Sequence, residues 1–238
     1  MPLASPRPAS LAAAPARVML TGAEQRTIRV TNSGGAVALI DVAPAGFGLD
    51  LRGRPRIVPR SDTVAARLVV QPRQLALKPG EASTLVVSAA IPTHAQAGDH
   101  PALVLLTTRP RPGSGLGVRL QIGIVVMVRV PGAVTHRLDV RRLRVRRVHG
   151  ADLIELAVLN RGNVTERLGR GRVLVTLRRR GRVIARLATT AREVFPRAVA
   201  TQTFRYAGRF RGLVTALVAV ARPASGVPVL RRSYRIRL

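Results

Sequence analysis

Runs of arginine are the residues of this sequence whose type and spacing most readily suggest chemistry. They form two groups in the second half of the chain: Arg141, Arg142, Arg144, Arg146 and Arg147, and then Arg178, Arg179, Arg180 and Arg182. A guanidinium group presents a planar fork of donors that matches phosphate and carboxylate groups. We therefore predict a polyanion-binding face. The alternative is a solvated arginine face that keeps strand edges from pairing with other molecules.

A second candidate is a row of aliphatic side chains. Val118, Leu120, Ile122 and Ile124 start this row at a spacing of two, and it continues to Val130. Side chains at this spacing share one face of a strand. Such a strand is buried in its own domain or pairs with a partner protein, so these four residues are candidates for a partner-binding strand.

Patterns for catalysis and metal binding are missing from the sequence. There is no cysteine, which excludes disulfides and thiol chemistry. The four histidines are dispersed, and the acidic residues show no paired spacing. The glycines of residues 113–117 precede a predicted strand, whereas a dinucleotide site needs a helix there. We expect no catalytic residues, no metal, no cofactor and no enzymatic activity.

The net charge points to an anionic partner. Forty basic and eleven acidic residues give +29, and Lys78 is the single lysine. Residues 1–132 hold 15 basic and 6 acidic residues (15 − 6 = +9), and residues 133–238 hold 25 and 5 (25 − 5 = +20). Such a surface attracts polyanions such as an anionic wall polymer. With only four Phe and two Tyr, and with Phe204 and Tyr206 predicted to face a core, nucleic acid is disfavoured.

The elements that must position these residues are strands. Apolar residues alternate with polar ones, and turn signals recur every 8–15 residues, which is typical of antiparallel sandwiches. We predict an all-β protein with two tandem Ig-like β-sandwich domains, 17–131 and 133–238, after a disordered Pro/Ala-rich leader, 1–16. The second domain should contain about seven strands, the first of them over residues 134–148 with a slip at Arg141–Arg142.

A weak internal repeat supports two similar domains. Residues 30–34 match residues 158–162 around an Asn-x-Gly turn, and the turn at Pro79 matches the one at Pro196. Gly98 and Gly212 each precede a strand, in the same order. Three signals in one order favour a duplicated domain.

The N-terminal residues bear on the cellular compartment of the protein. Residues 1–16 lack a charged stretch followed by an apolar one, so the given chain shows no signal peptide. No apolar run approaches the ~18 residues of a membrane-spanning helix. We expect an extracytoplasmic protein, secreted or wall-associated, whose signal has been removed or precedes the given start. The oligomeric state stays open.

Several segments resemble bacterial envelope proteins with tandem Ig-like domains. The stretches at 67–72, 77–80, 86–92 and 97–100, with a Pro-Gly turn and a strand ending in Pro, are similar to such domains. The long strand at 118–130, followed by Pro131, resembles the domain junction of PapD-like periplasmic pilus chaperones and of WxL-interacting cell-surface proteins. The first resemblance implies an exposed strand that completes a partner's fold. The second implies anchoring to the wall or to a surface protein.

Together these observations predict a non-catalytic binding or structural protein at the bacterial cell envelope. Its partner would be an anionic cell-wall polymer or a cell-surface protein. The alternatives are an assembly chaperone that uses strand 118–130, or a protein that binds nucleic acid by charge.

Overall fold

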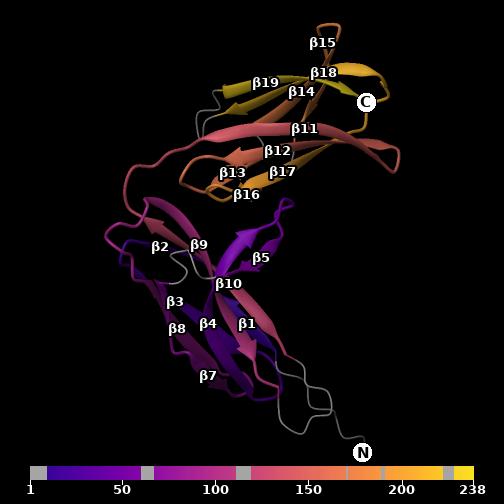
Figure 1. Cartoon of the computed structure of the whole chain (residues 1–238). Coiled ribbons are helices and arrows are strands. Elements are labelled where there is room, and N and C mark those ends of the chain that lie inside the picture. Colours follow the sequence, from indigo (N-terminus) through magenta and orange to yellow (C-terminus); the bar gives the residue numbers. More distant parts are fainter. Residues whose placement is uncertain (1–9, 60–66, 111–118, 170, 189–190, 222–227) are drawn as a thin grey trace, which may run out of the picture. The chain divides into compact units, whose positions relative to one another are not determined.

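The computed structural model describes residues 10–59, 67–110, 119–169, 171–188, 191–221 and 228–238. All elements within these residues are β-strands, numbered β1 to β19 (Figure 1). The chain divides into two compact units, the first formed by Met1–Gly48 and Arg56–Ala133 and the second by Leu49–Pro55 and Val134–Leu238. Each unit contains two main sheets, so the predicted fold class is confirmed.

Unit 1 is a sandwich of two sheets. One sheet contains, in spatial order, β1 (Leu11–Ala14), β3 (Gln25–Asn32), β8 (Ala82–Ala89) and β6 (Leu68–Gln71). The other contains β2 (Arg17–Thr21), β10 (Gln121–Val130), β9 (Gly98–Thr108), β4 (Ala38–Leu49) and β5 (Pro55–Val58), and β7 (Gln74–Leu77) pairs with β4. β3 pairs antiparallel with β1 and β8, and β9 pairs antiparallel with β4 and β10, whereas β2 and β10 run parallel.

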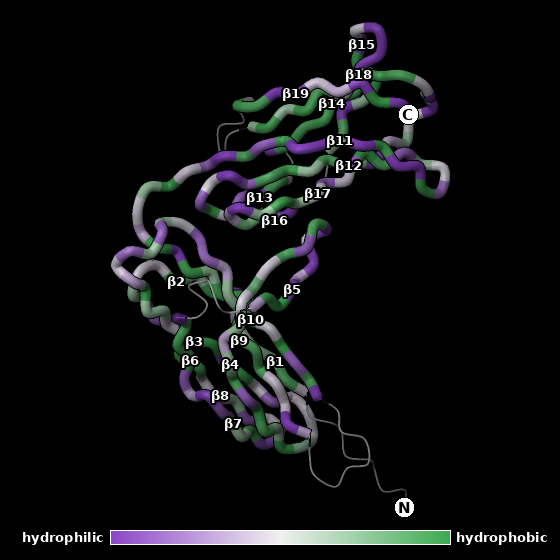
Figure 2. The backbone as a smooth tube through the Cα atoms, in the orientation of Figure 1, coloured by the Kyte–Doolittle hydropathy of each residue, from purple (hydrophilic) through white to green (hydrophobic). Residues whose placement is uncertain are grey.

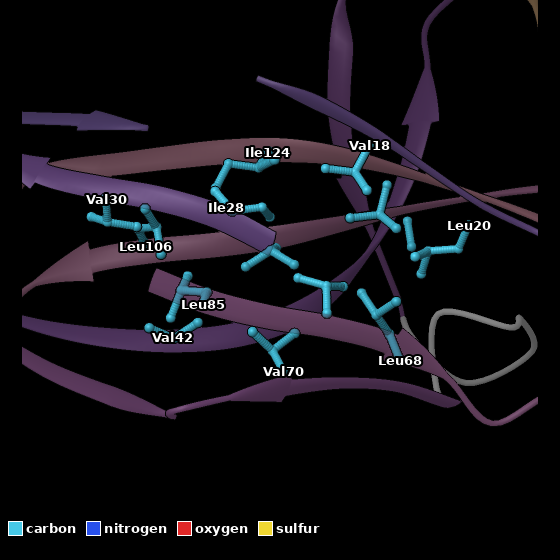
Figure 3. Packing of buried hydrophobic residues seen from close by; sticks show 14 of the residues in the cluster. Val18, Leu20, Ile28, Val30, Val42, Leu68, Val70, Leu85, Leu106 and Ile124 are labelled. Carbon is cyan, nitrogen blue, oxygen red and sulfur yellow. The ribbon is translucent and has the colours of Figure 1, made fainter. Parts of the chain in front are cut away.

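The core of unit 1 lies between these sheets and follows from the alternation of side chains. Ile28 on β3 and Leu85 on β8 face Ile124 on β10 and Leu106 on β9, and all four are fully buried (Figure 3). Apolar and polar residues alternate along the strands of both units (Figure 2). Burying each such side chain stabilises the fold by about 1.5–3 kcal/mol. The alternation of apolar and polar residues therefore determines which face of each strand packs into the core.

The N-terminal segment differs from the prediction. Leu11–Ala14, which we expected within an unstructured leader, form β1 and pair with β3 from Leu11↔Asn32 to Ala14↔Arg29. Composition alone favoured disorder, but the edge of β3 supplies backbone partners that local sequence does not reveal. Residues 1–9 lie outside the described residues.

Unit 2 is also built from two main sheets. One contains β11 (Leu138–Val148), β12 (Ala151–Asn160) and β17 (Val199–Tyr206), and a separate pair is formed by β13 (Glu166–Leu168) and β16 (Arg192–Val194). The other contains β15 (Arg182–Leu187), β14 (Val173–Arg179), β18 (Leu213–Ala221) and β19 (Pro228–Arg237). The core includes Leu156, Leu177 and Phe204, all fully buried.

Several strand limits differ from those expected. β11 begins at Leu138 rather than at residue 134, and the described residues of unit 2 form nine strands rather than about seven. The two additional strands, β13 and β16, have three residues each, too few for alternation to reveal them. The predicted slip is confirmed, since the register of β11 against β12 shifts between Val140 and Arg142.

The internal repeat has a close structural counterpart. The Nδ2 group of buried Asn32 donates to Ala36 O (2.8 Å) and Leu77 O (3.0 Å), and its Oδ1 accepts from Gly34 N (3.0 Å). Buried Asn160 does the same with Val164 O (2.8 Å), Val194 O (3.0 Å) and Gly162 N (2.8 Å). The backbone carbonyl of each asparagine also accepts a hydrogen bond from the turn that follows the matched proline. Gly80 N donates to Asn32 O (2.8 Å), and Arg197 N donates to Asn160 O (2.9 Å). Gly98 and Gly212 have φ values of 124° and 125°.

Candidate partner-binding edge and arginine clusters

Strand β10 is only half covered by its neighbours. On one side it pairs with β9 along its whole length, from Gln121↔Thr107 to Val130↔Gly98. On the other side, β2 pairs only with Val125–Arg129. Within the described part of the chain, no strand pairs with the second edge of Gln121–Ile124. We call residues 121–124 the open edge.

The open edge arises because the N-terminal segment changes sheets. β1 pairs with β3 in the first sheet, and β2 then pairs with β10 in the second. The backbone hydrogen bond of this segment that lies next to the open edge runs from Val125 N to Ala16 O (3.1 Å). The crossover therefore leaves the first four residues of β10 with one unpaired row of backbone groups, as in an edge strand.

The side chains of the aliphatic row on β10 become more exposed toward the start of the strand. Ile124 is fully buried, Ile122 is partly buried against the core, and Leu120, just before β10, is also partly exposed. Of the four predicted partner-strand residues, the structure thus leaves Leu120 and Ile122 accessible. Ile124 is a core residue, a correction that follows from its contact with the opposing sheet. Val118 lies outside the described residues.

The other end of β10 carries an ion pair that the sequence did not reveal. Arg129 Nε donates to Asp99 Oδ1 at 2.7 Å, and the Asp99 side chain is almost fully buried. This hydrogen bond raises the pKa of Arg129 above its ordinary value. The two residues face each other across β9 and β10 but are separated by 30 positions, so only the strand register brings them together.

The arginines of β11 are mostly engaged with carboxylates. Arg144 Nε donates to Glu155 at 2.5 Å on the neighbouring strand, and Arg146 lies 3.8 Å from the same carboxylate. Arg141 pairs with Asp139 at 3.5 Å. Arg142 and Arg147 are exposed and, among the described residues, make no ion pair. The first predicted group is therefore partly neutralised by its own unit.

The arginines of the β14–β15 hairpin are arranged differently. Arg178, Arg179 and Arg180 line one cavity together with Arg235 from β19. Arg182 follows them on β15 and is exposed, but it is not among the residues that line this cavity. The structure thus brings together three of the four residues of the second predicted group and adds Arg235 from the last strand.

A cluster around the buried carboxylate of Glu166 was also missed by the sequence analysis. His136 Nδ1 lies 2.9 Å from Glu166 Oε1, and Arg172 donates to the other oxygen of this buried carboxylate. The three residues come from separate segments of unit 2, so spacing offered no signal.

Among the described residues no group of three His, Cys, Asp or Glu side chains could hold a metal ion. Phe204 and Tyr206 are buried, so the prediction that they face a core is confirmed.

No helix of the described residues is long and apolar enough to span a membrane.

Comparison with known proteins identifies the fold. No family model matches the chain, and no curated protein matches it. Solved structures of fimbrial chaperones match nearly the whole chain. The class 5 fimbriae chaperone CfaA is 13% identical with a TM-score of 0.52, over 95% of this chain and 99% of CfaA. A chain of the chaperone–tip adhesin complex of CFA/I fimbriae is 13% identical with a TM-score of 0.54, over 95% and 98% of the two chains.

A third match is a chain of the CsuC–CsuE chaperone–tip adhesion subunit pre-assembly complex from Acinetobacter baumannii. It is 13% identical with a TM-score of 0.50, over 95% of this chain and 98% of the other. At this identity the likeness concerns the backbone arrangement. The chain has the fold of these fimbrial chaperones, two tandem Ig-like β-sandwiches.

Proposed function

We propose that this protein is a non-catalytic assembly chaperone of the bacterial cell envelope. It binds a surface subunit by adding the open edge of β10 to an incomplete β-sheet of that subunit. The observation that carries this proposal is the pairing of β10, which is complete toward β9 and stops at Val125 toward β2. Strand addition of this kind needs both an unpaired backbone row and alternating side chains that enter the partner.

The side chains at the open edge fit this role. Leu120 and Ile122 lie two positions apart, share the face of the aliphatic row and are accessible in the free chain. A subunit groove that accepts alternate side chains would bury both of them. The backbone pairs would supply affinity and the two aliphatic side chains would supply register, because a shift by one residue exchanges the faces of the strand.

The matched structures favour this function over the anionic-polymer function. They are chaperones, and two of them come from complexes with a tip subunit. This supports the PapD-like part of the resemblance, an extracytoplasmic location and the absence of an enzymatic role. Binding to nucleic acid by charge has no comparable support, since the aromatic residues Phe204 and Tyr206 that could stack on bases are buried.

Co-expression with tagged fimbrial subunits tests the proposal. The double variant Leu120→Ser/Ile122→Thr should weaken the chaperone–subunit complex about 100-fold or more, because two aliphatic side chains worth about 1.5–3 kcal/mol each no longer enter the partner. The complex is measured by co-purification through a tag on the subunit and by titration of the purified pair.

The matched control is Leu39→Ser/Val69→Thr, which changes two exposed aliphatic residues of unit 1 outside β10. This control should bind as the unmodified chain does, and both variants should keep its far-UV circular dichroism. Hydrogen exchange adds a direct measure, since amides of Gln121–Ile124 should become protected only in the complex. Equal binding by both double variants would overturn the proposal, as would failure of every subunit to bind.

A further inference from the structure

Unit 2 contains a solvent-open cavity beside the β14–β15 hairpin. Its volume is about 380 Å³, within the range of about 300–1,000 Å³ found for small-molecule sites. Its charged wall consists of Arg178, Arg179, Arg180 and Arg235, and Phe210 and Thr215 are also part of the lining. We call this the arginine pocket.

The strand register builds the charged wall. Arg178 on β14 pairs with Thr215 on β18, and Thr215 pairs with Arg235 on β19, so the three residues form one row across the sheet. Directly paired residues point to the same face. The row therefore places a hydroxyl group between two guanidinium groups, on the side of the sheet that faces away from the fully buried Leu177 and Ala216.

The hairpin turn adds two more guanidinium groups. Arg180 and Gly181 have φ values of 45° and 79°, as a two-residue type I′ turn requires at both central positions. The Cζ atom of Arg179 lies 4.2 Å from the centre of the Phe210 ring. This stacking orients the guanidinium plane of Arg179 and reduces the conformational entropy that it would lose on binding a ligand.

Carboxylates do not neutralise the arginine pocket. Among the described residues, Arg178, Arg179, Arg180 and Arg235 make no ion pair, and the guanidinium group of Arg179 stacks on the Phe210 ring. The acidic side chains of residues 133–238 lie elsewhere: Asp139 beside Arg141 and Arg161, Asp152 beside Arg211, Glu155 beside Arg144 and Arg146, Glu166 beside His136 and Arg172, and Glu193 on β16 opposite Arg167. Four like charges around one cavity repel one another, and a bound anion removes that cost.

We propose that the arginine pocket binds a phosphoryl ligand that carries two or more negative charges. Guanidinium forks match phosphoryl oxygens in pairs, and four of them exceed what one carboxylate can satisfy. Thr215 adds a neutral donor within the charged row. A soluble phosphoryl compound and the phosphomonoester headgroup of an anionic lipid present the same chemistry, and the two arms of the test distinguish them. The proposal does not depend on the chaperone function, because the pocket and the open edge of β10 are built from different units.

The test compares two variants of the full chain with the same loss of charge. Arg178→Gln/Arg235→Gln removes both ends of the charged row, and Arg142→Gln/Arg147→Gln removes two exposed arginines of β11 that make no ion pair among the described residues. Pyrophosphate binding is measured by titration calorimetry at 25 mM NaCl. Co-sedimentation at pH 8 with vesicles that contain phosphatidic acid, whose phosphomonoester headgroup can carry two negative charges, against phosphatidylcholine vesicles, measures binding to a lipid headgroup.

The pocket variant should bind pyrophosphate at least tenfold more weakly than the unmodified chain, and the β11 variant should bind it within about twofold. If only the vesicles show this difference between variants, the site is a lipid-headgroup site. Equal losses of pyrophosphate affinity in both variants would show that the anion binds to the overall positive charge rather than to the pocket, and would overturn the proposal. So would citrate binding as tightly as pyrophosphate, or the absence of binding to both pyrophosphate and vesicles.

Discussion

At the scale of single residues, two buried asparagines have the same role in the two units. Asn32 and Asn160 each connect the end of a strand to a following turn and to a distant strand through three side-chain hydrogen bonds. Buried polar groups are costly unless all their hydrogen bonds are made. The asparagine is therefore part of the core of each unit, although its sequence signature was only an Asn-x-Gly turn.

The change Asn160→Ala should lower the free energy of unfolding of unit 2 by about 3 kcal/mol or more, since it leaves the carbonyls of Val164 and Val194 and the amide of Gly162 without partners. Both tyrosines of the chain, Tyr206 and Tyr234, lie in unit 2 and there is no tryptophan. Urea unfolding followed by tyrosine fluorescence therefore reports on unit 2.

The matched change Asn32→Ala should lower the free energy of unfolding of unit 1 by a similar amount, measured from its circular dichroism transition. A loss below 1 kcal/mol for Asn160→Ala would show that the three hydrogen bonds are replaced by water.

At the scale of elements, the connection between β4 and β5 depends on one carboxylate. Asp50 Oδ1 accepts from Arg54 N and from Arg52 N, each at 2.8 Å, and Gly53 N donates to Asp50 O at 2.9 Å. The hydrogen bond from the Arg54 amide, followed by that from the Arg52 amide, lowers the pKa of Asp50 below its ordinary value. A lowered pKa in the folded state means that the ionised carboxylate stabilises this turn.

The turn at 50–54 should therefore loosen in acid. Its contribution is complete above the ordinary Asp pKa of about 3.9 and is lost as the pH falls through the lower folded value. Hydrogen exchange and chemical shifts of the Arg52 and Arg54 amides, measured between pH 2 and pH 6, should follow this titration. Asp50→Asn keeps an acceptor oxygen but does not titrate, so its amides should show no such change. An equal change in this variant would assign the effect to another group.

At the scale of the whole molecule, the charge is a source of instability. The chain carries +29, of which +20 lies in residues 133–238 with 25 basic and 5 acidic residues. Self-repulsion of this size favours expanded states. Salt at 0.1 M limits charge interactions to about 10 Å, so it weakens this repulsion.

Added salt should stabilise unit 2. The urea midpoint reported by tyrosine fluorescence should rise between 10 and 300 mM NaCl, and Arg142→Gln/Arg147→Gln should raise it at low salt but not at high salt. A midpoint that falls with salt would mean that the ion pairs of Glu155 and Glu166 outweigh the repulsion.

The amino-acid sequence by itself determined the class of structure, because alternate side chains on an extended chain face opposite sides whatever the strand pairs with. It also predicted the asparagine turns and the bulge at Arg141–Arg142, since these depend on neighbouring residues. The tertiary structure alone decided the partners of each strand. Ile124 is buried because it packs against the opposing sheet, and the edge of Gln121–Ile124 is open because β2 pairs only with Val125–Arg129. Arg178 and Arg235 line one cavity because each pairs with Thr215 on β18, which lies between their strands. Such pairings join distant segments, and no local pattern specifies them.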